Sequence, residues 1–110
     1  MPILTKFNES YKLWHGFLIH LPKLTKHTLG TKIDNLFTDI IELTLTASYI
    51  QRTEKIIFLE KISKKLDTLK YFITILWEIK GLNTNKYSQL SGQLITAGKM
   101  MGGWIKEMKK

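Results

Sequence analysis

Apolar residues recur at alternating steps of three and four along four segments of the sequence, which span 4–21, 29–50, 59–76 and 87–108. In a helix this spacing places the apolar side chains on one stripe that faces a partner. No segment sustains the two-residue alternation of a half-buried strand. Isoleucine and threonine favour strands by propensity. Their lower helix propensity costs only roughly a few tenths of a kcal/mol per residue, and burial of a continuous apolar stripe outweighs this cost. The pattern therefore predicts an all-α chain.

Residues that stop and start helices fall between these segments. Pro22 lacks a backbone N–H and clashes with the preceding turn, so it cannot continue a helix interior. Thr28 and Thr53 carry side chains typical of N-caps and are expected to begin the second and third helices. Gly81 suits a left-handed residue that ends the third helix, and Asn83 or Thr84 can cap the fourth. We therefore predict helices at about 4–21, 28–50, 54–80 and 84–108.

The predicted connections are short, and short connections force neighbouring helices to run antiparallel. The 110 residues are enough for one domain and too few for two. The sequence therefore predicts an up-down-up-down four-helix bundle that forms a single domain over residues 1–110.

Some apolar residues fall outside the predicted stripes, and for eight of them two interpretations stay open. A wide stripe buries more than the seam positions of a helix. A second apolar face, alternatively, is covered by another subunit. The eight residues are Leu13, Phe17, Phe37, Ile41, Phe58, Phe72, Ile75 and Ile79.

Three glycines, Gly98, Gly102 and Gly103, interrupt the predicted fourth helix. Each costs about 1 kcal/mol relative to alanine in a helix interior. Glycines that cost this much in a helix indicate that another backbone approaches closely along the Gly98-x-x-x-Gly102 spacing. That backbone belongs either to the same bundle or to another subunit.

The sequence offers no familiar set of catalytic or metal-binding residues. It contains no cysteine, no Glu-x-x-His pair, no phosphate-binding Gly-x-x-x-x-Gly-Lys loop and no Gly-x-Ser-x-Gly turn. His15 and His20 do not share a helical face, and His27 falls in a predicted loop. We expect no enzyme activity, no cofactor and no metal.

The longest early apolar stretch, residues 13–21, contains two histidines and is too short for a transmembrane helix, which needs about 20 apolar residues. Its flanks do not match a signal peptide. The expected location is the cytoplasm, with no membrane partner.

Positive charge is concentrated in the second half of the chain. The net charge is +8; residues 51–110 hold twelve basic residues against five acidic ones, whereas residues 1–50 hold five against four. Such a field favours phosphate-rich partners. Only one basic residue of the chain is an arginine, so binding would be directed at phosphates and tolerant of base sequence. The candidate nucleic-acid-binding residues are Arg52, Lys55, Lys61, Lys64, Lys65, Lys70, Lys106 and Lys109.

An ordinary solvated face is the alternative for any one of these lysines, with helical pairs such as Glu60 and Lys64. A net charge of +7 in sixty residues is harder to assign to solubility alone.

Several short segments in fixed order resemble the four-helix-bundle family of the accessory variability determinant (Avd) proteins of diversity-generating retroelements and the ribosomal-RNA intervening-sequence proteins. The likeness covers nearly the whole chain, and the Gly-Gly-Trp near its end leans toward the Avd branch. The segments are Thr28-Leu29-Gly30, Ala47-Ser48-Tyr49, Leu66-Asp67-Thr68-Leu69, Tyr87-Ser88-Gln89-Leu90-Ser91 and residues 98–106.

This resemblance implies a non-catalytic accessory subunit. Avd-like proteins form pentameric barrels, bind the reverse transcriptase of the retroelement and associate with RNA or cDNA during mutagenic copying. The resemblance therefore predicts a homo-oligomer, a homopentamer, with reverse transcriptase and nucleic acid as partners. The alternatives are a stand-alone RNA-binding bundle of the intervening-sequence type and a scaffold whose lysines contact anionic lipid.

Overall fold

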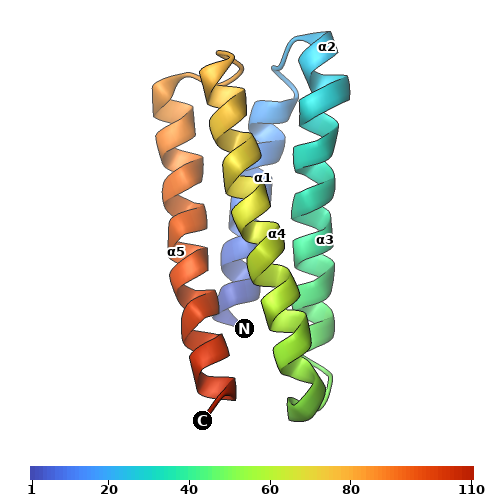
Figure 1. Cartoon of the computed structure of the whole chain (residues 1–110). Helices are drawn as coiled ribbons and strands as arrows, with labels where there is room; N and C mark the ends of the chain where they lie inside the picture. The colour runs from blue at the N-terminus through green and yellow to red at the C-terminus, as the bar shows by residue number, and fades with distance from the viewer.

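A computed structural model describes residues 1–110 and contains helices and connections, with no strands. Four long helices form the bundle (Figure 1). They are α1 (Pro2–Leu18), α3 (Thr31–Ala47), α4 (Arg52–Glu78) and α5 (Thr84–Met108). A short helix α2 (Lys23–Thr25) and a π-helical turn (Lys26–Gly30) lead into α3.

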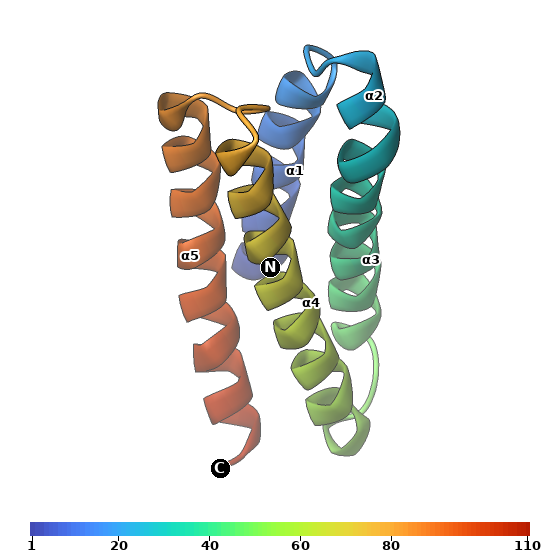
Figure 2. The same cartoon turned by 45° about the horizontal axis from the view of Figure 1, so that its top comes forward.

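The helices pack in the order predicted for an up-down-up-down bundle. α1 and α4 each pack against both α3 and α5, so consecutive long helices are neighbours and the ring closes between α1 and α5. The bundle measures 45 × 22 × 19 Å. Figures 1 and 2 show the start of α4 and the end of α5 continuing past the N-terminus of α1. That end of the bundle is therefore built mainly from the connection between α3 and α4 and from the last turns of α5.

The predicted stripe of α4 is confirmed at every position. Its six members are buried in one apolar core, together with residues of the other three long helices. The stripe of α1 is shifted by comparison: Phe7 and Trp14 are fully buried, but Ile3 and Ser10 are buried where Leu4 and Tyr11 were expected. The six α4 residues are Leu59, Ile62, Leu66, Leu69, Ile73 and Leu76.

The second predicted helix begins earlier than expected. α1 ends at Leu18, and Pro22, with φ −55° and ψ 147°, precedes the new helix at Lys23. The prediction of Thr28 as an N-cap is wrong, because Thr28 lies inside the π-helical turn and its hydroxyl donates to the Leu24 carbonyl at 2.8 Å. A helix can run through this segment because Pro22 stands before its first turn, where a missing N–H costs nothing.

The connection between α3 and α4 is also shifted. α3 ends at Ala47, before the predicted residue 50, and α4 begins at Arg52. The N-cap is Gln51, with extended backbone and no side-chain capping bond, so the assignment of Thr53 as the cap is wrong. Thr53 lies in the first turn, where its backbone is already helical.

The left-handed residue at the end of α4 is Lys80, with φ 67°, and not the predicted Gly81. The Lys80 N–H donates to the Trp77 carbonyl and the Gly81 N–H to the Leu76 carbonyl, at 2.9 and 2.8 Å, which is the hydrogen-bond pattern of a Schellman motif. Gly81 is needed for space instead: a Cβ there would lie 2.3 Å from Leu76 Cδ1. The predicted cap of α5 is confirmed, because Asn83 Oδ1 accepts from the Lys86 N–H at 2.8 Å.

Most of the apolar residues outside the predicted stripes belong to a wide buried face. Phe37 is fully buried, and five others are partly buried against the core: Leu13, Phe17, Ile41, Phe58 and Phe72. Ile75 is half-buried, and Ile79 is 56% exposed. Among these eight residues, only Ile75 and Ile79 are left for a second apolar face.

The glycines of α5 do not mark a close approach within the chain. A Cβ at Gly98 would make ordinary contacts with Leu66 and Lys70, at 3.7 and 3.8 Å. A Cβ at Gly102 or Gly103 would meet nothing within 4 Å. Both positions therefore lie on the outside of the bundle.

Two polar contacts attach α1 to its neighbours. The fully buried Trp14 donates from Nε1 to Asp34 Oδ1 of α3 at 3.2 Å, and the buried Ser10 hydroxyl lies 3.0 Å from Gln93 Oε1 of α5. Burial, and then the neighbouring Asp34 carboxylate, raise the pKa of Tyr11 above its ordinary value. Every buried side-chain nitrogen or oxygen has a hydrogen-bond partner. The core therefore contains no unpaired polar side-chain atom.

Candidate nucleic-acid interface

The eight predicted basic residues do not form a single patch. Six lie on α4 and two, Lys106 and Lys109, at the end of α5. α4 presents its basic side chains in three directions: toward α5, toward α3 and straight outward. The three groups differ in what surrounds them.

Arg52 and Lys55 continue the heptad register of the α4 core stripe into the end of the bundle that projects past α1 (Figure 1). The Arg52 guanidinium donates to the carbonyls of Glu107 and Lys110, at 3.1 and 3.4 Å. It therefore caps the C-terminal end of α5, where carbonyls lack helical partners. Lys55 Nζ lies 5.9 Å from the centroid of the Trp104 ring. Both side chains hold α4 against α5.

Lys65 and Lys70 each face a carboxylate. Lys65 Nζ lies 3.5 Å from Asp39 Oδ2 of α3, and Lys70 Nζ lies 3.5 Å from Asp67 Oδ1, one turn away on α4. These carboxylates are more than half exposed, and exposed ion pairs contribute about 0–1 kcal/mol. A phosphate can therefore compete for either lysine at modest cost.

Lys61 and Lys64 are exposed and form no ion pair. Lys61 Nζ lies 5.8 Å from the centroid of the Phe58 ring, so its neighbour there is an aromatic ring and not a carboxylate. A shallow hollow beside them is lined by Ile57, Glu60 and the two lysines. Glu60 and Lys64, the example of a helical pair on an ordinary solvated face, do not form an ion pair. Lys106 and Lys109, at the end of α5, are likewise exposed and without an ion pair.

One residue missing from the predicted set is Tyr71, whose side chain is 66% exposed on α4. It follows Lys64 by seven residues, which is two helical turns, so both project from the same side of the helix. The seven-residue interval between Lys64 and Tyr71 is visible in the sequence, and it could have placed Tyr71 beside Lys64. The prediction considered this spacing only for the apolar stripe of the helix and not for its outer face.

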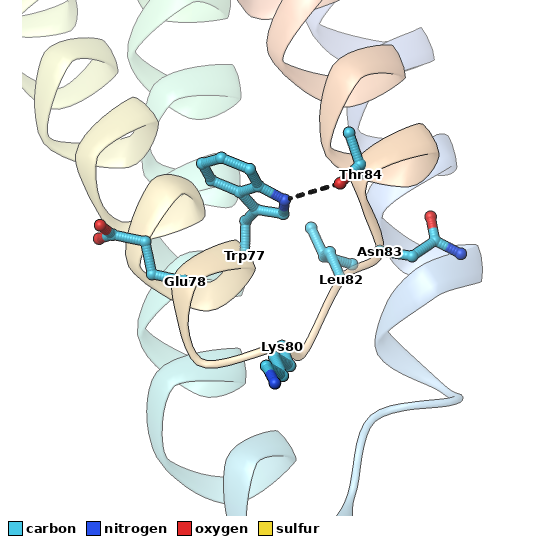
Figure 3. Close-up of a pocket in the computed structure, with 6 residues that line it drawn as sticks. All are labelled: Trp77, Glu78, Lys80, Leu82, Asn83 and Thr84. Atoms are coloured by element: carbon cyan, nitrogen blue, oxygen red, sulfur yellow. Dashed lines mark hydrogen bonds between the residues drawn. The ribbon is translucent and has the colours of Figure 1, made fainter.

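The largest hollow of the molecule lies elsewhere, at the turn between α4 and α5, and has a volume of about 720 Å³. Figure 3 shows Trp77 and Thr84 on its wall, with Trp77 Nε1 donating to Thr84 Oγ1 at 3.3 Å. The Trp77 ring stacks on Tyr87, with 4.5 Å between ring centroids. Of the basic residues only Lys80 lines this hollow. None of the eight candidates is there.

The structure gathers no group of three or more His, Asp or Glu side chains that could hold a metal ion. His15, His20 and His27 are each exposed, and His15 has the ring of Tyr11 as its aromatic neighbour at 6.1 Å. None of the helices is both sufficiently long and sufficiently apolar to cross a membrane.

The model of the family described as bAvd-like matches residues 1–108. This chain belongs to the bAvd-like family. A match of that length includes all four long helices and confirms the resemblance to Avd proteins seen in the sequence. No curated protein matches the chain.

Proposed function

We propose that this bAvd-like chain is a non-catalytic accessory subunit of a diversity-generating retroelement. In this role it binds the reverse transcriptase together with the template RNA or the cDNA. The observation that carries the proposal is the family match over residues 1–108, joined to a net charge of +7 within residues 51–110. Accessory binding needs a stable surface of the right charge and needs no reactive group.

Binding of nucleic acid follows from phosphate contacts by lysine. Each neutralised phosphate releases counterions, so affinity falls as salt rises, with a slope of about −0.7 per contact for single strands. Lys61, Lys64, Lys106 and Lys109 support this role best, because they are exposed and form no ion pair. Lys65 and Lys70 are secondary candidates, since a phosphate must displace Asp39 or Asp67. Arg52 and Lys55 support the site by fixing α4 to α5.

Self-association is part of the proposal, with the pentamer as the state that the family resemblance implies. Large apolar side chains are exposed at the end of the bundle that carries α2. Ile19, Leu24 and Ile79 are 56%, 76% and 56% exposed there. Exposed large apolar side chains gathered at one end of a bundle favour contact with another subunit. Size-exclusion chromatography with light scattering measures the mass directly, and a strict monomer at micromolar concentration would overturn this part.

Co-purification with the reverse transcriptase of the same element tests the function. We expect the two proteins to elute together, and we expect the purified chain to retain template RNA in low salt. RNA retention without any polymerase contact would instead favour a stand-alone RNA-binding bundle. Binding to anionic vesicles without RNA binding would favour a membrane-surface scaffold.

A further inference from the structure

The outward face of α4 carries a row of four exposed side chains, Lys61, Lys64, Thr68 and Tyr71, which we call the α4 strip. These residues are spaced by three, four and three, so they lie on one side of the helix, opposite the buried stripe. α4 is packed against α3 on one flank and α5 on the other. No element of the chain covers the strip between them.

The α4 strip is positively charged along half its length. Neither lysine forms an ion pair, and the charged contacts on either flank, Lys65 with Asp39 and Lys70 with Asp67, are each balanced. Two carboxylates without an ion pair border the strip: Glu60 in the hollow beside Lys61 and Lys64, and Glu42 of α3 in a second hollow that Lys61 also lines. Neither forms an ion pair with Lys61 or Lys64. The positive charge of the strip is therefore available to an outside anion.

Tyr71 presents an aromatic ring at the other end of the strip. Its only aromatic neighbour is Phe72, with 6.1 Å between ring centroids and 68° between ring planes. That edge-on contact leaves the side chain 66% exposed. Phe72 is partly buried against the core, whereas Tyr71 beside it is exposed to solvent.

The dimensions of the strip suit a short run of nucleotides. A helix rises about 1.5 Å per residue, so Lys61 and Tyr71 are about 15 Å apart along the axis. Stacked nucleotides advance about 3.4 Å each along one strand, so the strip spans about four of them. Lysines at one end and a ring at the other match the two parts of a strand, phosphate and base.

We propose that the α4 strip binds single-stranded nucleic acid, with phosphates against Lys61 and Lys64 and one base stacked on Tyr71. The inference rests on the proposed function and adds to it a preference for single-stranded over duplex nucleic acid. Bases in a duplex are already stacked and paired, so only an unpaired base can lie on the Tyr71 ring. Aromatic stacking on an unpaired base tolerates any sequence, which suits a subunit that accompanies a polymerase along its template.

Fluorescence anisotropy with a short labelled thymidine strand, its abasic counterpart and a duplex of the same length tests the proposal. We expect Tyr71→Ala to weaken binding of the thymidine strand about tenfold, which is about 1.4 kcal/mol, because one stacked base loses its aromatic partner. Tyr71→Phe keeps the ring and is expected to retain affinity. Binding of the abasic strand and of the duplex should change less than twofold, which is roughly within 0.5 kcal/mol.

Tyr49→Ala is the matched control, because Tyr49 is 81% exposed but lies after α3, away from the strip. An equal loss in this variant, or an equal loss on the abasic strand, would overturn the stacking of a base on Tyr71. A changed molecular mass of Tyr71→Ala in light scattering would assign Tyr71 to a contact between copies and would also overturn it. A wild-type protein that binds no strand would overturn the proposed function itself, whereas binding unaffected by Tyr71→Ala would overturn only this inference.

Discussion

The indole nitrogen of Trp14 donates to Asp34 Oδ1 at 3.2 Å and joins α1 to α3 through a side chain that is fully buried. Removing the acceptor leaves that N–H without a partner in the core, which costs about 1–3 kcal/mol. We therefore expect Asp34→Ala to lower the free energy of unfolding by that amount in a urea titration.

Asp39→Ala is the control for this variant. It removes an aspartate from the same helix, but one that contacts only the partly exposed Lys65 at 3.5 Å. The expected change is within about 0.5 kcal/mol. Equal losses in the two variants would contradict a structural role for the Trp14–Asp34 hydrogen bond.

Tyr11 makes stability sensitive to alkaline pH. Burial first, and then the Asp34 carboxylate, raise the pKa of Tyr11 above its ordinary 10.0. Above pH 10 the unfolded chain loses this proton before the folded chain does, so the folded state binds more protons and unfolding becomes easier as pH rises. The contribution is complete below pH 10 and is lost as pH passes through the raised pKa.

We expect Tyr11→Phe to show a shallower fall of Tm above pH 10 than the wild type. Tyr49→Phe, at a position 81% exposed, is expected to follow the wild-type curve. Parallel curves for all three proteins would show that Tyr11 does not carry this dependence.

Substitutions at two adjacent positions of the turn after α4, Lys80 and Gly81, are expected to have opposite effects on stability. Lys80 has φ 67°, which costs a side-chain-bearing residue about 1 kcal/mol, so Lys80→Gly should raise stability by roughly that amount. Gly81→Ala should lower it, because the new Cβ would lie 2.3 Å from Leu76 Cδ1 in the core. Thermal unfolding by circular dichroism measures both, and a stabilising Gly81→Ala would contradict the steric role of Gly81.

The two unpaired lysines of the α4 strip should control the salt dependence of binding. Lys61→Gln with Lys64→Gln removes two phosphate contacts, so the slope of log K against log salt should fall in magnitude by about 1.4 for a single strand. Helix content and molecular mass should not change, because both side chains are exposed.

Lys12→Gln with Lys23→Gln makes the same change of charge on α1 and α2, away from α4. This control is expected to leave the slope nearly unchanged. A similar drop in both double variants would mean that net charge, and not the α4 strip, governs binding.

Sequence spacing predicted the part of the fold that depends on local periodicity. The α4 stripe was predicted in full because each member is a large apolar residue in strict register and is buried. Ser10 was missed as a core residue because it is polar, and one of the two acceptors of its hydroxyl, Gln93, is 83 residues away in the sequence. The start of the second helix was missed because no capping side chain marks it, only Pro22 before its first turn.

For the candidate interface, too, the sequence shows local features but not the contacts between helices. The excess of basic residues on α4 and the end of α5 is visible in the sequence, whereas the partners of those residues are not. Asp39 reaches Lys65 from another helix, and Arg52 donates to carbonyls that only the packing of α5 brings near it. Pairings across helices decide which cations are free, and these depend on the rotation of each helix in the bundle.

The central claim, that this basic helical bundle holds a nucleic-acid strand for a polymerase, is tested most directly by titrating the purified protein into labelled template RNA. The titration is repeated at rising salt from below about 50 mM. We predict saturable binding in low salt whose log K falls linearly with log salt. Failure to bind the RNA even at the lowest salt would contradict the account.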